Sequence, residues 1–212
     1  MRLKMLVSRS ICLFMFALLA ISAFTQQPAT VPKLESSHSQ ARLPGPVAPT
    51  GAPPASILLI RHAEKRTDGQ LDLSPTGFKR ASLLPNLFTP GRIDLPIPQV
   101  IFATHQSKHS NRPVETVTPL AAALHLPIDS SIAHEGYAAL AAELLSGKYA
   151  GKVALVAWHH GTVPALAAVL GVRPPYTPWP NQQFDRVWKI DYKDGKATVL
   201  DIPQHLMPGD SN

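Results

Sequence analysis

Cysteine is nearly absent from this chain of 212 residues, because Cys12, close to the N-terminus, is its one cysteine. A single cysteine excludes internal disulfides and cysteine-based zinc sites. Cys12 also falls in a segment that we expect to be removed, so a cysteine nucleophile is excluded from the mature protein.

Runs of like charge are missing as well. The formal net charge is +6, yet the Lys and Arg residues are scattered, and Arg2, Lys4 and Arg9 lie at the very start. Nucleic-acid binding needs a clustered basic patch, so no nucleic-acid partner is expected. The sequence also lacks a Gly-x-Ser-x-Gly string, and its histidines do not show metal-ligand spacing. Both facts argue against a serine hydrolase and a metal-dependent enzyme, and no cofactor is expected.

Long apolar runs are limited to residues 11–24, which follow the three early basic residues. This run is short for a membrane span and typical of a signal-peptide core, with small residues Ala20, Ser22 and Ala23 as cleavage points. We therefore expect residues 1–25 to be an export signal and the protein to be periplasmic or secreted. An uncleaved signal would instead act as a membrane anchor.

Proline is abundant, with 22 residues, and clusters after this segment. Residues 26–55 are rich in Pro, Ser, Ala and Gln and show no apolar periodicity, which predicts an extended, disordered linker. The remaining sequence has an ordinary globular composition. We expect one folded domain over residues 56–205 and a C-terminal tail over residues 206–212.

Short apolar runs alternate with helical patterns along this domain. Ile57–Ile60, Val100–Ala103 and Lys152–Ala157 are predicted to be strands buried on both faces. The predicted helices begin at Pro75 after an N-cap at Ser74, and cover residues 115–124 (with Pro119 inside), 137–145 and 164–170. Two late strands, residues 186–191 and 197–201, flank an Asp-Gly turn. The pattern predicts an α/β fold, a three-layer sandwich with a mostly parallel central sheet.

Basic side chains follow the predicted strands, where ligands bind in such folds. His62 follows the first strand, Arg112 comes after the second, and His159 and His160 follow the third. Arginines can donate paired hydrogen bonds to phosphate oxygens, and a neutral histidine can attack phosphorus to form a phosphoenzyme. The sequence therefore predicts a phosphoryl-transfer site that needs no metal.

Four motifs in order carry a resemblance to a known family. Residues 60–64 read Ile-Arg-His-Ala-Glu, residues 73–81 read Leu-Ser-Pro-Thr-Gly-Phe-Lys-Arg-Ala, and residues 112–116 read Arg-Pro-Val-Glu-Thr. A histidine and a glycine follow the late strand within residues 153–161. The chain resembles the histidine phosphatase superfamily, which includes the phosphoglycerate mutases, and would be an exported bacterial member. The resemblance implies a phosphohistidine intermediate on His62 and phosphate binding by Arg61 and Arg112.

The chain departs from the family pattern at two places. Ala63 replaces the commoner glycine, and residues 104–111 are longer and more polar than usual. That stretch contains His105 and His109, which we interpret as solvated loop residues.

The general acid and the second catalytic histidine stay open. Glu135 lies where this branch of the family often has its acid, and Glu64 is the competitor, either contacting phosphate or orienting an arginine. A family string with Gly-His-Ser-Asn-Thr-Val-Pro would select His159, whereas a subset with Trp-Glu-His-Gly would select His160. An extended backbone would turn the two histidines to opposite faces, so that only one could face the phosphate. Residues 158–161 read Trp-His-His-Gly and resemble the second string more closely, so we favour His160 and give His159 a secondary phosphate contact.

The sequence thus predicts a phosphomonoester hydrolase acting on a small phosphorylated substrate or a phosphoprotein. The alternatives are a phosphoglycerate mutase-like phosphotransferase, against which export and the lack of a long insertion argue, and a non-catalytic module that binds phosphate groups or a partner.

Overall fold

The computed structural model describes residues 42–211. The expected signal segment and residues 26–41 of the expected linker lie outside the described residues. The described chain forms a sheet with strand order β3-β2-β4-β1-β5-β6. Its strands are β1 (Ser56–Arg61), β2 (Val100–Ala103), β3 (Ile128–Asp129), β4 (Val153–Trp158), β5 (Arg186–Lys193) and β6 (Lys196–Pro203).

Four of these strands are parallel and the last two form an antiparallel hairpin. β4 pairs in parallel with β1 and β2, and β2 pairs in parallel with β3, a strand that we did not predict. β5 runs antiparallel to β1 and is joined to β6 by Asp194 and Gly195, both with positive φ. Such a conformation is what the Asp-Gly pair predicts, so the hairpin and the mostly parallel sheet are confirmed.

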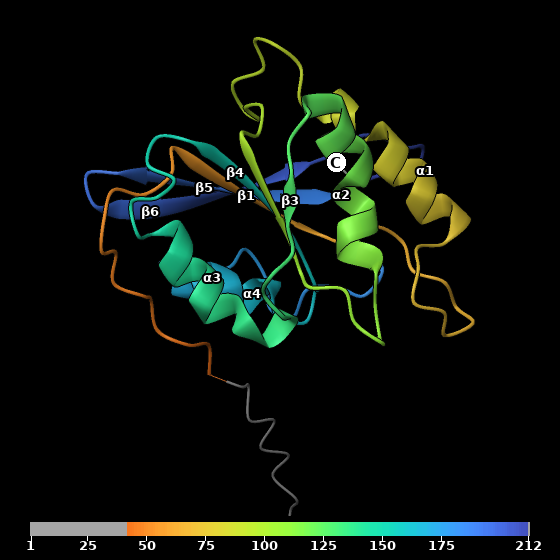
Figure 1. Ribbon diagram of the computed structural model, residues 1–212, viewed down its shortest axis with the longest axis horizontal. Coiled ribbons are helices and arrows are strands. Elements are labelled where there is room, and N and C mark those ends of the chain that lie inside the picture. Colours follow the sequence, from red (N-terminus) through yellow and green to blue (C-terminus); the bar gives the residue numbers. More distant parts are fainter. Residues whose placement is uncertain (1–41, 212) are drawn as a thin grey trace, which may run out of the picture. The chain divides into compact units, whose positions relative to one another are not determined.

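Helices cover both faces of the sheet. Figure 1 shows α1 (Pro75–Leu83) and α2 (Arg112–Leu124) on one side, and α3 (Tyr137–Leu144) and α4 (Val163–Val169) on the other. Two short 3₁₀ helices, η1 (Leu84–Leu87) and η2 (His134–Gly136), connect the layers. The three-layer α/β architecture is confirmed. No helix among residues 42–211 has the length and apolar character to cross a membrane.

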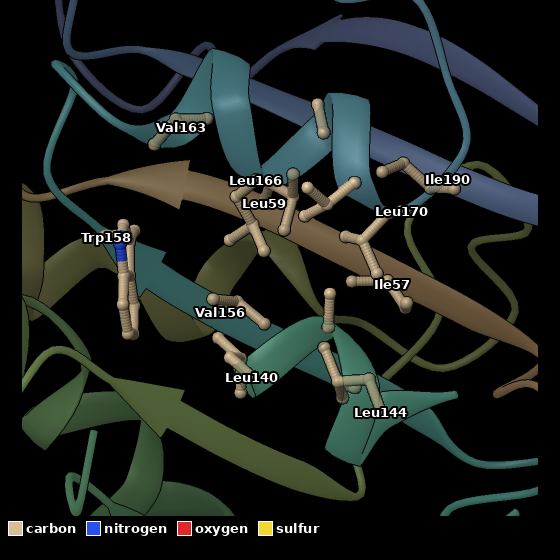
Figure 2. Packing of buried hydrophobic residues seen from close by; sticks show 14 of the residues in the cluster. Ile57, Leu59, Leu140, Leu144, Val156, Trp158, Val163, Leu166, Leu170 and Ile190 are labelled. Atoms are coloured by element: carbon tan, nitrogen blue, oxygen red, sulfur yellow. The ribbon is translucent and has the colours of Figure 1, made fainter. Parts of the chain in front are cut away.

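The central strands are buried on both faces, which explains their uninterrupted apolar sequences. In β1, Ile57 and Leu59 pack with α3 and α4, and Figure 2 shows Leu59 beside Leu166 of α4. Leu58 and Ile60 belong to the other core cluster, which contains residues of α2 and η1. Successive strand residues point to opposite faces, so a strand with helices above and below it needs apolar residues throughout.

Local capping agrees with the sequence at α1, where the Ser74 hydroxyl accepts a hydrogen bond from the Gly77 N–H (3.1 Å). At α2 the helix begins at Arg112, earlier than the predicted Glu115, with Pro113 in its first turn. A proline there loses no helical hydrogen bond, because the first N–H groups of a helix have no partner within it. The helix continues through Pro119.

Residues 42–55 run along the domain without helix or strand, and they form backbone hydrogen bonds with it. The Val47 N–H donates to the Val169 carbonyl (2.8 Å), and the Thr50 and Gly51 N–H groups donate to the Leu145 carbonyl (both 3.1 Å). Val169 and Leu145 lie at the ends of α4 and α3, where carbonyls lack a helical partner. The compact unit therefore begins before Ser56.

Candidate active site

A cavity of about 560 Å³ opens at the carboxyl ends of β1, β2 and β4. These strands are neighbours in the sheet, with Arg61 paired to Trp158 and Ala103 paired to Ala157 in register, so the residues that follow them meet at one edge. Six histidines contribute to the lining: His62, His105, His109, His134, His159 and His160. Arg112, Lys65 and Glu135 line it too. The fold thus brings His62, Arg112 and the paired histidines together at one cavity, as the sequence predicted.

His62 lies directly after β1 with only 2% of its surface exposed. Its Nδ1 lies 2.7 Å from the Ala63 carbonyl oxygen, which can only accept, so Nδ1 carries the proton and Nε2 keeps its lone pair. The pKa of His62 is lowered to about 2, chiefly by burial and also by the charges of Arg61 and Arg112, while the hydrogen bond to the Ala63 carbonyl acts in the opposite direction. The ring is therefore neutral and oriented, as a nitrogen nucleophile must be.

The segment that carries His62 is held by α1 and α2. The Ala63 N–H donates to Thr116 Oγ1 (2.9 Å), and the Thr116 hydroxyl donates to the Arg112 carbonyl (2.7 Å). The Ser74 N–H donates to the Glu64 carbonyl (2.8 Å). A Cβ atom on Gly77 would lie 2.3 Å from that carbonyl oxygen, so only glycine fits there. The sequence motifs at residues 73–81 and 112–116 thus have a structural role beside His62.

Arg61 points away from solvent and is anchored by the loop before β5. Its Nη1 donates to the carbonyl oxygens of Pro180, Asn181 and Gln183 at 3.0–3.1 Å, and its guanidinium carbon lies 3.9 Å from the centre of the Phe184 ring. Burial lowers the pKa of Arg61 to about 10, and Arg112 also lowers it. Even so, Arg61 remains a cation at neutral pH.

Several buried hydrogen-bond donors near His62 are unpaired, and those of Arg61 belong to a side chain outside the cavity lining. Arg61 Nε and Nη2 and Arg112 Nε are buried without a partner in residues 42–211, although Arg112 Nη1 donates to the Leu71 carbonyl (3.1 Å). The hydroxyl of Thr104, a residue that is 2% exposed and lines the cavity, has no partner there either. Buried donors are normally satisfied, so this group of donors suits an anion with several oxygen atoms.

Both paired histidines contact the site. The ring centres of His159 and His160 lie 5.5 Å and 6.3 Å from that of His62. The expectation that only one could face the phosphate assumed an extended backbone, but the chain turns after Trp158, and the His159 carbonyl accepts from the Thr162 and Val163 N–H groups. Burial lowers the pKa of each histidine to about 4, helped by His134 at His159 and by Arg61 at His160.

The two acid candidates lie in different places. Glu135 lines the cavity, with its side chain 74% exposed, and its Oε1 lies 2.9 Å from Nε2 of His134. η2, which carries both residues, is held by a hydrogen bond from Trp158 Nε1 to the His134 carbonyl (3.1 Å). Glu64 does not line this cavity; its Oε1 accepts from Nε and Nη2 of Arg80.

Sequence reasoning did not identify Lys65, Thr104 or His134 as site residues, and all of them line the cavity. Thr104 directly follows β2, so the rule that identified His62 after β1 would have found it. His105 and His109, interpreted as solvated, are exposed but line the cavity. No group of His, Cys, Asp or Glu within residues 42–211 is arranged to hold a metal ion.

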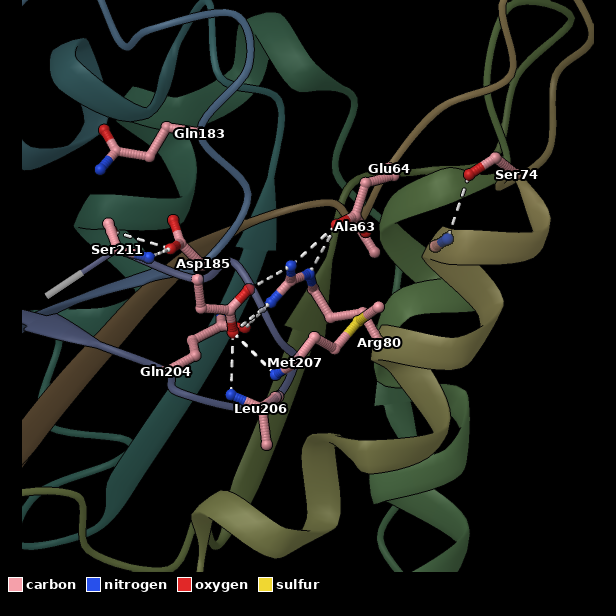
Figure 3. A network of polar contacts seen from close by, with 12 residues as sticks. Ala63, Glu64, Ser74, Arg80, Gln183, Asp185, Gln204, Leu206, Met207 and Ser211 are labelled. Atoms are coloured by element: carbon pink, nitrogen blue, oxygen red, sulfur yellow. Dashed lines mark hydrogen bonds and ion pairs between the residues drawn. The ribbon is translucent and has the colours of Figure 1, made fainter.

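Behind the nucleophile, Arg80 connects Glu64 to the C-terminal segment, as Figure 3 shows. Arg80 Nη2 donates to Asp210 Oδ1 (2.7 Å) and Nη1 to Oδ2 (3.0 Å). Asp210 Oδ2 also accepts from the Leu206 and Met207 N–H groups. Residues 206–211, expected to be a tail, are thereby fixed to the domain.

Replacing Asp210 by Asn should lower the free energy of unfolding by about 2 kcal/mol, because it removes one of the two carboxylates paired with the buried Arg80 guanidinium and leaves Glu64 as the other. Chemical denaturation at neutral pH measures this. The matched control is Asp68→Asn, whose ion pair with Arg66 is exposed to solvent, so its loss should leave the free energy of unfolding nearly unchanged. Equal losses in the two variants would contradict the role given to Asp210.

Comparison with known proteins identifies the fold. No protein-family model matches the sequence, and no curated protein matches it significantly. Phosphoserine phosphatase from Entamoeba histolytica, solved with 3-phosphoglyceric acid, superposes with a TM-score of 0.50 at 13% identity, over 72% of this chain and 99% of that chain. Phosphoglycerate mutase from Plasmodium falciparum gives 0.48 at 14% identity, over 74% and 96%. Alpha-ribazole phosphatase from Shigella flexneri gives 0.43 at 16% identity, over 74% and 100%. The chain therefore has the histidine phosphatase fold, as its motifs predicted.

Proposed function

We propose that the protein is a phosphomonoester hydrolase that works through a phosphohistidine on His62, without a metal ion. The observation that carries the proposal is the neutral, buried ring of His62, oriented through Nδ1, beside unpaired N–H groups of Arg61 and Arg112. A lone pair on Nε2 provides the nucleophile. The guanidinium groups provide charge and donors for the phosphoryl oxygens.

The reaction has two steps. Nε2 of His62 attacks phosphorus, the bond from phosphorus to the leaving oxygen breaks, and an acid protonates that oxygen. Water then attacks the phosphohistidine, gives its proton to the same group, and releases orthophosphate with neutral His62. The positive charge on the phosphorylated ring is stabilised by the Ala63 carbonyl, which accepts from Nδ1. A cavity of about 560 Å³ suits a small-molecule substrate better than a folded phosphoprotein.

Glu135 is the proposed proton donor, since it lines the cavity while Glu64 is bound to Arg80. Glu135→Gln should reduce kcat about 100-fold for alkyl phosphates and only a few-fold for 4-nitrophenyl phosphate, whose leaving oxygen needs little protonation. Steady-state kinetics on both substrates measures the difference. Glu143→Gln, on α3 and outside the cavity, is the control. Equal losses on both substrates would exclude Glu135 from this role.

Of the paired histidines, we propose His160 as the one that completes the phosphate site, with His159 in a secondary contact. A bound phosphate dianion would raise the pKa of either ring above its value of about 4 and favour the cation. His160→Ala should therefore lower kcat/KM about 100-fold or more, and His159→Ala about tenfold. The reverse order in parallel assays would assign the role to His159.

The activity itself is tested with a panel of phosphomonoesters at several pH values, with and without EDTA. We expect release of orthophosphate that chelation leaves unchanged. Loss of activity with EDTA, or no turnover of any member, would overturn the proposal. Export is a separate proposal from residues 1–25, and N-terminal sequencing of the mature protein should find a start between about residues 21 and 30.

A further inference from the structure

The cavity extends well beyond the nucleophile, and its outer wall is polar and basic. Apart from the groups assigned to the reaction, the described lining residues include hydroxyls of Ser107 and Thr162 and imidazoles of His105 and His109. Ala133 and Gly161 are the described lining residues without a polar side chain, and no Phe, Tyr or Trp is included. A nucleoside or aryl leaving group would find no Phe, Tyr or Trp ring in this lining, whereas a hydroxylated leaving group would find hydrogen-bonding partners.

Charge on this wall is unbalanced. Lys65 is exposed at the rim, and no ion pair joins it to an acid within residues 42–211. Glu135 is the one carboxylate among the described lining residues, and it already contacts His134. Lys65 is close enough to lower the pKa of His160, which places its charge beside the phosphate site rather than on a remote surface.

The opposite wall is an ordered loop. Ser107 and Ser110 exchange backbone hydrogen bonds, and the His109 N–H donates to Ser107 Oγ (3.2 Å). His105 Nδ1 lies 2.9 Å from the Ser130 carbonyl oxygen, so it carries the proton and Nε2 remains free to contact a ligand. The buried Thr104 hydroxyl, without a partner in the described chain, is a further donor on the same side.

On the basis of the proposed function, we propose that the preferred substrate is a small polyol phosphate with a second anionic group, which Lys65 binds. The phosphate that reacts lies at His62, the hydroxyl groups contact the polar wall, and the second carboxylate or phosphate pairs with the Lys65 ammonium. A compact ammonium on a flexible stem accepts either kind of anion.

A matched pair of substrates isolates the second charge. Gluconate 6-phosphate and glucitol 6-phosphate have the same carbon chain and differ only by a carboxylate in place of a hydroxymethyl group. For the wild-type protein, kcat/KM should be about five- to tenfold higher for gluconate 6-phosphate, and the ratio should fall with added salt. In Lys65→Met the ratio should approach one. The control Lys79→Met, at an exposed lysine of α1 outside the cavity, should keep the wild-type ratio.

Binding separates this proposal from the hydrolase proposal. Calorimetric titration of His62→Ala with each compound should show the same preference without turnover. Equal affinities, or a preference that survives Lys65→Met, would overturn the role of Lys65. If 4-nitrophenyl phosphate is hydrolysed without any preference between the pair, this inference fails while the proposed function stands. If nothing is hydrolysed but the binding preference is present, the proposed function fails and the anion site remains.

Discussion

His62→Asn should abolish phosphatase activity, lowering kcat/KM by about 10⁴-fold or more, the scale of losing a covalent nucleophile. The asparagine amide has no basic nitrogen, so no phosphoenzyme forms. Rapid quenching into alkali with ³²P-labelled substrate should trap labelled wild-type protein and no labelled variant, because phosphohistidine survives in base. The control is His125→Asn, at the exposed C-cap of α2, where asparagine tolerates the positive φ.

Activity that survives in His62→Asn, or label that appears in it, would assign the nucleophile to another residue. His159 and His160 are the nearest alternatives, with ring centres 5.5 Å and 6.3 Å away. Neither has the hydrogen bond from a ring nitrogen to a neighbouring carbonyl that fixes the tautomer of His62. That difference is why we place the phosphoryl group on His62.

The sheet could be predicted because each of its central strands is marked by a short apolar run within its own sequence. Strands buried on both faces need continuous apolar runs, and β1, β2 and β4 have them. The residues after those strands then meet at one edge for topological reasons, which is why His62, Arg112 and the paired histidines were found. β3 escaped prediction because two residues carry no periodic pattern.

Contacts between distant parts of the chain could not be predicted. The ion pair of Arg80 with Asp210 joins residues 130 positions apart, and neither lies in a pattern that indicates the other. Residues 42–55 have the composition of a linker and contain no helix or strand. Their N–H groups nevertheless find free carbonyls at the ends of α3 and α4, which composition does not reveal.

The prediction for the paired histidines depended on one assumption, namely that the backbone stays extended after the late strand. Opposite orientation of His159 and His160 follows only if β4 continues, and β4 ends at Trp158. The turn into α4 brings both rings to the cavity. Sequence motifs therefore indicated which segments line the cavity, while the role of each histidine depends on backbone geometry.

Arg112→Lys should lower kcat/KM about 100-fold or more while the protein stays folded, although the charge is conserved. Arg112 uses Nη1 to hold the carbonyl of Leu71, which leaves Nε as an unpaired donor toward the site. A lysine can make one of these contacts but not both, because its ammonium is a point charge without the planar fork. Kinetics on one alkyl phosphate and the inhibition constant of orthovanadate measure the loss, with exposed Arg173→Lys as the control. Wild-type values in Arg112→Lys would mean that charge alone suffices, and the separate roles given to Nη1 and Nε of Arg112 would be wrong.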